Sequence, residues 1–154
     1  SVGYSIKDNN SKETIESSIY DEANYFEHLM QDIKRAEKNI LISSPYLQKK
    51  KINEIKEILT EKYKTGTRIT LCIKTLEQYS EKYKHFIADF INEMRREGFN
   101  IIQLPNNHLK FMVVDNVIVW YGNIDILGGS YNDNSLIRIQ DETLANELIG
   151  EITE

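Results

Sequence analysis

The sequence predicts an α/β fold in which a mixed, mainly parallel sheet is flanked by helices. Segments with apolar side chains spaced three or four residues apart alternate along the chain with short runs of consecutive apolar residues. The first pattern is typical of a helix with one buried face, and the second of a strand buried on both faces. Their alternation favours helices layered on a sheet with parallel strands. Because no linker or internal repeat interrupts it, we expect a single domain over residues 1–154.

The first two thirds of the chain show this alternation three times. Residues 1–14 are polar and predict a flexible tail, followed by a short extended segment at residues 18–20. Asp21 and Ser80 are candidate N-caps, and Gly66 and Gly98 are expected to end helices. The expected helical faces run from Phe26 to Ile33, from Ile52 to Tyr63 and from Tyr83 to Met94, and the expected strands are 39–43, 68–74 and 100–104.

The last third predicts a hairpin, a strand and a closing helix. Residues 108–115 and 117–121 are apolar runs on either side of Asp115-Asn116, a good two-residue turn. Residues 136–139 predict another strand, and residues 142–149 predict a helix with one apolar side.

Composition excludes several classes of protein. No apolar run approaches the roughly 18 residues that cross a bilayer, and no segment is typical of a signal peptide, so we expect no membrane partner. Cys72 is the single cysteine, which rules out a disulfide framework within the chain and favours a reducing cytoplasmic location. Because the chain begins with Ser1, we expect either a processed chain or a domain of a longer protein.

The charge pattern limits how the chain would bind nucleic acid. A net charge of −5 argues against binding by charge alone, because lysine and arginine contacts to phosphate supply most non-specific affinity. Lys49, Lys50 and Lys51 form a local basic patch, which fits either a phosphate contact or a solvated helix start. Ser44, Tyr46 and Thr75 follow expected parallel strands, where ligands usually bind, and are weaker candidates.

The hairpin carries the residues with the most chemistry. Side chains alternate between the two faces of a strand, so His108 and Lys110 would share one face and Asp115 the other. A histidine beside a cation suits phosphate binding. The returning strand brings Gly122, Asn123 and Asp125 level with His108, where polar side chains can complete a pocket.

The spacing of these residues is specific. The pattern in this chain reads His108-x-Lys110, four residues, Asp115, six residues and then Gly122-Asn123-x-Asp125. It resembles the signature of the phospholipase D superfamily, which reads HxK, four residues, D, six residues and then GSxN. The resemblance extends to the strand-end loops and implies a phospholipase D-like half with one motif per chain. Residues 119–122 and 133–139 look most like the phospholipase D-like domains appended to bacterial helicases and restriction systems.

That resemblance implies a mechanism and a partner. His108 would attack phosphorus and form a phosphohistidine, while a second histidine protonates the leaving oxygen. Lys110 would stabilise phosphoryl charge and Asn123 would hydrogen-bond the phosphate, whereas Asp115 would be structural. No metal or other cofactor is implied. Since the chain holds one motif, the second histidine must come from a homodimer with a two-fold interface. A helicase domain in the same polypeptide is a further expected partner.

Asp125 departs from the family pattern, in which asparagine stands at this position. A carboxylate repels a phosphodiester, so the sequence leaves two functions open. One is a metal-independent nuclease acting on DNA or RNA. The other is a catalytically impaired module that binds nucleic acid or mediates dimerisation within a larger helicase-type protein.

Several other residues have two interpretations. Trp120 and Tyr121 fit either stacking on a base or packing in the core, and core packing is the more common role in an apolar strand. Asp133 fits either orientation of the partner histidine or solvation of a loop. His28 and His85 lie outside any HxK context and are expected to be surface or half-buried residues of helices.

Overall fold

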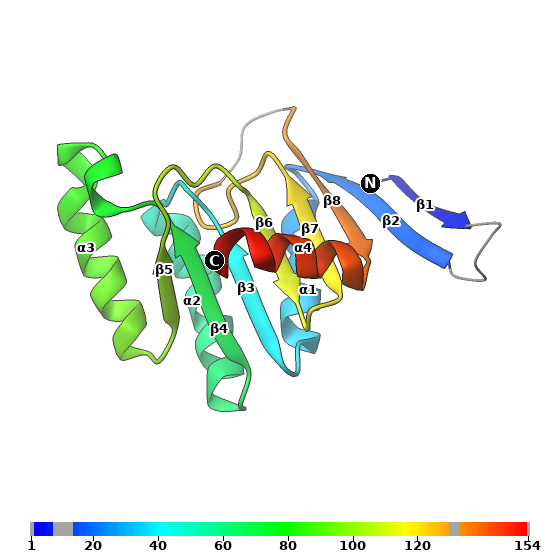
Figure 1. Ribbon diagram of the computed structural model, residues 1–154, viewed down its shortest axis with the longest axis horizontal. Helices are drawn as coiled ribbons and strands as arrows, with labels where there is room; N and C mark the ends of the chain where they lie inside the picture. Colours follow the sequence, from blue (N-terminus) through cyan, green and yellow to red (C-terminus); the bar gives the residue numbers. More distant parts are fainter. Residues whose placement is uncertain (1, 8–13, 130–132, 154) are drawn as a thin grey trace.

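The computed structural model describes residues 2–7, 14–129 and 133–153 (Figure 1). Eight strands, four α-helices and one short 3₁₀ helix are found in this part of the chain. In chain order they are β1 (Val2–Lys7), β2 (Thr14–Asp21), α1 (Tyr25–Arg35), β3 (Asn39–Ser43), α2 (Lys49–Lys64), β4 (Arg68–Ile73), η1 (Leu76–Gln78), α3 (Glu81–Arg96), β5 (Asn100–Gln103), β6 (Phe111–Val114), β7 (Ile118–Gly122), β8 (Ser135–Gln140) and α4 (Glu142–Thr153).

The strands form one mixed sheet in the order β1-β2-β8-β7-β6-β3-β4-β5. This confirms the α/β class and the mixed sheet. Only the pairs β3–β4 and β4–β5 are parallel, and the other pairs are antiparallel. The expectation of mainly parallel strands therefore holds for β3 to β5 and not for the whole sheet. The difference arises because helix–strand alternation stops after β5, and hairpin connections take over.

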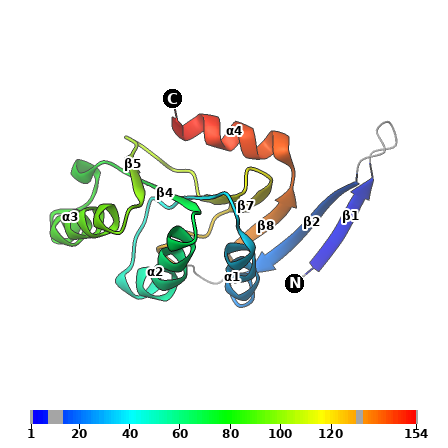
Figure 2. The ribbon, with the colours of Figure 1, turned by 90° about the horizontal axis from the view of Figure 1, so that it is seen from below.

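Helices cover both faces of the sheet, as Figure 2 shows with α4 on one side and α1 and α2 on the other. One core cluster joins the buried faces of α1, α2 and α3 to side chains such as Ile42, Met112 and Trp120. A smaller cluster joins α4 to the opposite sheet face, through Leu41, Val113 and others. Alternation along β3, β6 and β7 thus divides each strand between two cores.

The β6–β7 hairpin has the turn that its sequence predicts. Asp115 and Asn116 have φ values of 54° and 59°, and the Val117 N–H donates to the Val114 carbonyl at 3.1 Å. Two consecutive residues with positive φ are what a type I′ turn requires. The Asp115 carboxylate accepts from the backbone N–H groups of Glu37, Lys38 and Asn39, so it fixes the α1–β3 connection. This contact explains why an aspartate stands at the turn.

Three details differ from the sequence-based expectations. Val2–Lys7 form strand β1 paired with β2 instead of a flexible tail, while residues 8–13 lie outside the described part of the chain. Asp21 ends β2, and Asn24 precedes α1 as its N-cap. Strand β6 begins at Phe111, so His108 and Lys110 lie in the irregular segment that leads into it and not within a strand.

The topology gathers several strand ends at one edge of the sheet, the upper edge in Figure 1. Strands β3 and β4 are parallel and end there, whereas β6 is antiparallel to β3 and therefore begins there. Strand β7 returns to the same edge, and β8 starts from it. We call this the motif edge, because it holds the backbone around Tyr46, Lys74, Lys110 and Asn123. None of the described helices is long and apolar enough to cross a membrane.

Candidate functional site

A cavity of about 840 Å³ opens at the motif edge. Three of the four site residues predicted from the sequence line it: Lys110, Asn123 and Asp125. Its other lining residues come from the β3–α2 loop, from Tyr79 and the first turns of α3, and from the segments that follow β7 and precede β8. They are Tyr46, Leu47, Gln48, Lys49, Tyr79, Tyr83, Phe86, Ile87, Gly128, Gly129 and Asn134. The cavity therefore has a polar side from the hairpin and an aromatic, apolar side from the helical layer.

Lys110 and Asp125 form an ion pair inside this cavity. Lys110 Nζ lies 2.8 Å from Asp125 Oδ2, and the Lys110 side chain is 26% exposed against 9% for Asp125. The other carboxylate oxygen, Oδ1, accepts from the Tyr46 N–H at 3.1 Å. Asp125 is thus held by two partners, and its charge is balanced by the cation that the motif would offer to a phosphate.

Asn123 is anchored to strand β8. The Ser135 N–H donates to Asn123 Oδ1 at 2.8 Å, and the Asn123 N–H donates to the Ser135 carbonyl at 3.2 Å. Gly122 permits this close approach, since a Cβ there would lie 2.2 Å from the Ser135 carbonyl oxygen. With Oδ1 engaged, the side-chain N–H₂ of Asn123 is the group that can donate to a ligand in the cavity.

His108 is exposed and is not among the residues that line the cavity. Its backbone is nevertheless fixed from both sides. Buried Asn107 donates from Nδ2 to Ser43 Oγ at 2.9 Å and accepts the Leu109 N–H at 3.1 Å. Ser43 Oγ donates in turn to the Leu109 carbonyl at 2.7 Å. These bonds tie the residues on either side of His108 to the end of β3, which gives an exposed side chain a rigid base.

The remaining motif residue, Asp115, lies at the opposite end of the hairpin. Its carboxylate binds backbone N–H groups of residues 37–39, as described above, which agrees with the structural role that the resemblance implies. Asp133 is exposed with a φ of 74° and directly follows residues outside the described part of the chain. His28 is half-buried beside Tyr20, and His85 is exposed on α3 next to Asp89, as expected for helix residues outside the site.

The three weaker candidates, which follow the parallel strands, have different roles in the structure. Tyr46 lines the cavity and is 58% exposed. Ser44 is buried, donating to the Tyr46 carbonyl at 2.8 Å and accepting the Leu127 N–H at 3.1 Å, so it holds the loop together. Thr75 bonds to Gln78 at the start of η1 and does not line the cavity.

The lysines of the basic patch differ from one another in the structure, and so do the two aromatic residues of β7, Trp120 and Tyr121. Lys49 lines the cavity, whereas Lys51 pairs with Glu54 within α2. Trp120 is fully buried, and its Nε1–H donates to Asp32 at 2.7 Å, which makes it a core residue. Tyr121 is 40% exposed on the same strand.

Sequence reasoning missed the aromatic side of the cavity. Tyr79 is buried, donates its O–H to the Pro45 carbonyl at 2.7 Å and accepts the Lys74 N–H at 3.1 Å. Burial raises the pKa of Tyr79 to about 12. Tyr83 is 50% exposed in the first turn of α3. The sequence does contain one indication of this aromatic side. The apolar face of α3 extends to Tyr83 and Phe86 at its N-terminal end, one turn before the first residue of its buried core.

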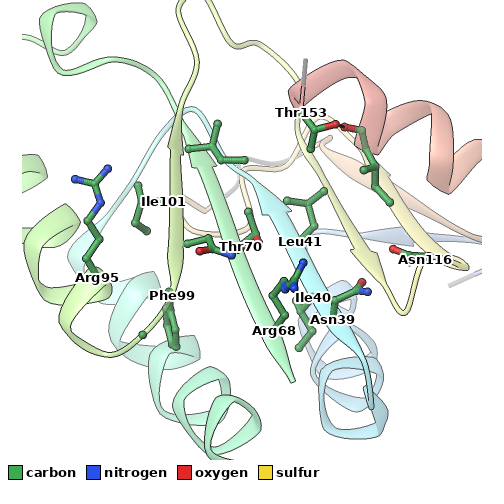
Figure 3. Close-up of a pocket in the computed structure, with 14 residues that line it drawn as sticks. Asn39, Ile40, Leu41, Arg68, Thr70, Arg95, Phe99, Ile101, Asn116 and Thr153 are labelled. Atoms are coloured by element: carbon green, nitrogen blue, oxygen red, sulfur yellow. Dashed lines mark hydrogen bonds between the residues drawn. The ribbon is translucent and has the colours of Figure 1, made fainter. Parts of the chain in front are cut away.

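A second cavity, of about 740 Å³, lies away from the motif edge (Figure 3). It is lined by residues from the beginnings of β3, β4 and β5, including Asn39, Arg68 and Asn100, together with Thr153 of α4. None of the sequence-predicted site residues lines it. Among the residues that the structure describes, no three His, Cys, Asp or Glu side chains form a group able to hold a metal ion.

Comparison with known families identifies the class of protein. Residues 29–154 match the family model described as the cardiolipin synthase, PLD-like domain. The chain therefore belongs to the family of phospholipase D-like domains, in agreement with the motif spacing. A comparison with curated protein sequences finds no match.

Solved structures with the same fold include three with nearly complete coverage of this chain. NucT from Helicobacter pylori has a TM-score of 0.68 and 11% identity, covering 90% of this chain and 93% of its own. The phospholipase D family member Nuc from Salmonella typhimurium has a TM-score of 0.67 and 17% identity, covering 89% and 90%. TrmBL2, an archaeal chromatin protein whose structure shows a novel mode of DNA binding, has a TM-score of 0.63 and 13% identity, covering 88% and 50%. At these identities the similarity establishes the fold.

Proposed function

We propose that this domain is a metal-independent phosphodiesterase that cleaves DNA or RNA as a homodimer. The observation that carries the proposal is the placement of the motif. Lys110 and Asn123 face one cavity at the motif edge, and an exposed His108 stands on a rigid segment two residues from Lys110. A cation and an amide donor in a cavity, with an exposed histidine two residues along the chain from that cation, suit a reaction at phosphorus.

The proposed reaction has two balanced steps. A ring nitrogen of His108 attacks phosphorus, a phosphorus–nitrogen bond forms, and the bond from phosphorus to the leaving oxygen breaks. The second copy's His108 gives its proton to that oxygen. Water then attacks phosphorus, the same second histidine takes a proton from the water, and the phosphorus–nitrogen bond breaks. Lys110 and Asn123 stabilise the charge that develops on the phosphoryl oxygens.

Asp125 is compatible with this reaction because its charge is already paired. Its Oδ2 atom binds Lys110 and its Oδ1 atom accepts the Tyr46 N–H. A phosphate entering the cavity would share the ammonium group of Lys110 with this carboxylate. The expected consequence is weaker phosphate binding than an asparagine would permit at position 125.

The homodimer is supported by partly exposed apolar side chains beside His108. Ile102, Leu104 and Leu109 pack on the α4-side core and stay partly exposed, and the Asn107 N–H bonds to the Leu104 carbonyl next to His108. A two-fold contact through this surface would bury them and bring two copies of His108 together. We further propose, from the motif resemblance, that the domain works beside a helicase domain in a longer polypeptide.

A second candidate function is a nucleic-acid-binding module without catalysis. The Lys110–Asp125 ion pair favours it, because it occupies the cation that an active site would use. The similar fold of TrmBL2, a chromatin protein described as binding DNA, is consistent with it.

Hydrolysis of bis(p-nitrophenyl) phosphate in excess chelator separates the two functions. We expect turnover by the unmodified chain and loss of about a thousandfold or more in His108→Ala, the scale seen when a nucleophile is removed. His85→Ala is the matched control, since His85 is an exposed histidine on α3. No turnover by a chain shown to be dimeric, or equal turnover by His108→Ala, would contradict the enzymatic proposal.

A further inference from the structure

The most exposed large apolar side chains gather where the motif lies. Among the described residues, Tyr46 is 58% exposed and Tyr83 is 50% exposed, more than Ile19, Tyr63 and Tyr121. Both tyrosines line the cavity that holds Lys110. Two half-exposed aromatic rings in one cavity with an ammonium group are informative, because their faces are available to stack on a flat ligand.

The backbone of Tyr46 is held rigidly although its ring is exposed. Its N–H donates to Asp125, and its carbonyl accepts the Ser44 hydroxyl. The preceding carbonyl, of Pro45, accepts the Tyr79 hydroxyl. Gly128 packs against the Tyr46 carbonyl so closely that a Cβ there would lie 2.6 Å from its oxygen. The ring is therefore presented from a fixed base, which lowers the entropy cost of binding a flat ligand.

Two lysine ammonium groups lie over the same ring. Lys74 Nζ lies 4.5 Å from the Tyr46 ring centroid, and Lys110 Nζ lies 5.5 Å from it. Lys49 lines the cavity as well. An aromatic ring with ammonium groups nearby matches a nucleotide unit, since the ring can stack on a base while the ammonium groups contact the adjoining phosphates.

We infer that the cavity takes a single-stranded polynucleotide with one base stacked on Tyr46 and the adjoining phosphate at Lys110. The inference rests on the proposed phosphodiester function and specifies its substrate class. A base within a duplex is stacked on its neighbours, so its face is available to Tyr46 only in a single strand. An anionic lipid headgroup without a ring or a quaternary ammonium group, such as phosphatidylglycerol, would use the lysines but would gain little from a fixed aromatic face.

Binding measured in the His108→Ala background tests this, because the strand then stays intact. The probes are a fluorescent single-stranded oligonucleotide of about 12 nucleotides, within the usual footprint of such sites, the same strand annealed to its complement, and phosphatidylglycerol vesicles. We expect the single strand to bind at least about tenfold more tightly than the duplex, given the added stacking. Adding Tyr46→Ala should weaken single-strand binding by about tenfold to a hundredfold.

Two variants serve as controls for ring identity and position. Tyr46→Phe keeps the stacking ring and should bind within about twofold of the parent, as should Tyr63→Ala, which removes an exposed tyrosine of α2 outside the cavity.

A third variant tests the phosphate contact. Lys74→Gln should lower the slope of log affinity against log salt by about 0.7, the value for one phosphate contact on a single strand. Circular dichroism checks that each variant is folded.

Three outcomes would overturn the inference. They are equal affinity of Tyr46→Ala and its parent, equal affinity for single strand and duplex, or binding of vesicles without binding of the oligonucleotide. These outcomes are distinguishable from failure of the proposed catalysis. If the chain binds the strand through Tyr46 but does not hydrolyse a diester, the inferred binding site is supported and only the proposed catalysis is contradicted.

Discussion

Asp125 decides how strongly Lys110 can act on a phosphate. The carboxylate accepts the ammonium group of Lys110 at 2.8 Å and the Tyr46 N–H at 3.1 Å, so it has one electrostatic and one structural task. These two tasks can be separated by substitution, since an asparagine keeps an oxygen for the Tyr46 N–H and carries no charge.

Asp125→Asn is expected to lower KM for a phosphodiester by about tenfold, because opposite charges about 4 Å apart near a protein surface interact by more than 1.4 kcal/mol. Steady-state kinetics on bis(p-nitrophenyl) phosphate measure this. Asp125→Ala is the control, since it removes the charge and also the acceptor for Tyr46. An unchanged or higher KM in Asp125→Asn would show that the ion pair does not compete with substrate.

Tyr79 links the fold to the site through a buried hydroxyl. It donates to the Pro45 carbonyl and accepts the Lys74 N–H, so it fixes the loop that carries Tyr46. Tyr79→Phe should lower the free energy of unfolding by about 1–2 kcal/mol, since both partners lose a bond in a buried place.

The pH dependence of this loss follows from the raised pKa. Burial raises the pKa of Tyr79 from 10.0 to about 12, so the folded state favours the protonated phenol. The stabilisation is fully present below pH 10 and is lost as pH rises from 10 through 12. Denaturant titrations should show a constant difference between the parent chain and Tyr79→Phe up to pH 10, then a shrinking one. A difference that grows above pH 10 would contradict this assignment.

At the scale of secondary structure, one buried network joins α1 to the hairpin side of the sheet. Asp32 of α1 is 3% exposed and accepts from Trp120 Nε1 on β7 and from Arg138 Nε and Nη2 on β8. The hydrogen bonds that Arg138 donates to Asp32 are the main reason that the pKa of Arg138 is raised. The network fixes β7 and β8, whose ends carry Asn123 and its anchor.

Asp32→Ala should destabilise the fold by about 2–3 kcal/mol, because it leaves the partly buried Arg138 cation and a buried indole N–H without an acceptor. Chemical denaturation measures the loss. The double variant Asp32→Leu with Arg138→Met removes the stranded charge, so it should be more stable than Asp32→Ala by at least about 1 kcal/mol. A double variant less stable than the single one would show that packing, and not the unpaired charge, dominates.

The elements were predictable where local sequence alone determines them. The helices α2 and α3, the strands β3 to β5 and the turn at Asp115-Asn116 all formed as expected, although β3 and β4 are mostly buried and β5 is a partly exposed edge strand. The β1–β2 pairing was missed, although Val2, Tyr4 and Ile6 alternate with Gly3, Ser5 and Lys7 as residues of a strand do, because the neighbouring strand β2 pairs in turn with the distant strand β8. Asp32 also gave no signal, since its partners lie 88 and 106 residues away.

The residues of the site were also predictable from spacing along the chain, whereas the contacts between distant segments were not. The motif spacing predicted four site residues, His108, Lys110, Asn123 and Asp125, of which the structure brings the last three into one cavity and leaves His108 outside its lining. The Lys110–Asp125 pair and the aromatic wall of Tyr79 and Tyr83 depend on how β6, β7 and α3 meet, so no spacing along the chain encodes them.

At the scale of the whole molecule, the proposed mechanism needs two copies of His108. Unfolded parent chains can be mixed with equal amounts of unfolded His108→Ala chains and then refolded together. If a site needs a histidine from each subunit, the mixture should have about one quarter of the activity of the same total amount of refolded parent chain. The activity against mixing ratio distinguishes this from a self-sufficient subunit, which would keep about one half. A chain that is active as a monomer in sedimentation experiments would exclude the dimeric site.

The central claim, chemistry at phosphorus through His108, is tested most directly by trapping the covalent intermediate. The parent chain is mixed with a p-nitrophenyl diester labelled at phosphorus in excess chelator, denatured within the first turnover and digested. The label is expected on the peptide that contains His108 and should be absent from His108→Ala, while His85→Ala labels normally. Turnover without label on this peptide, or label that persists in His108→Ala, would contradict the account.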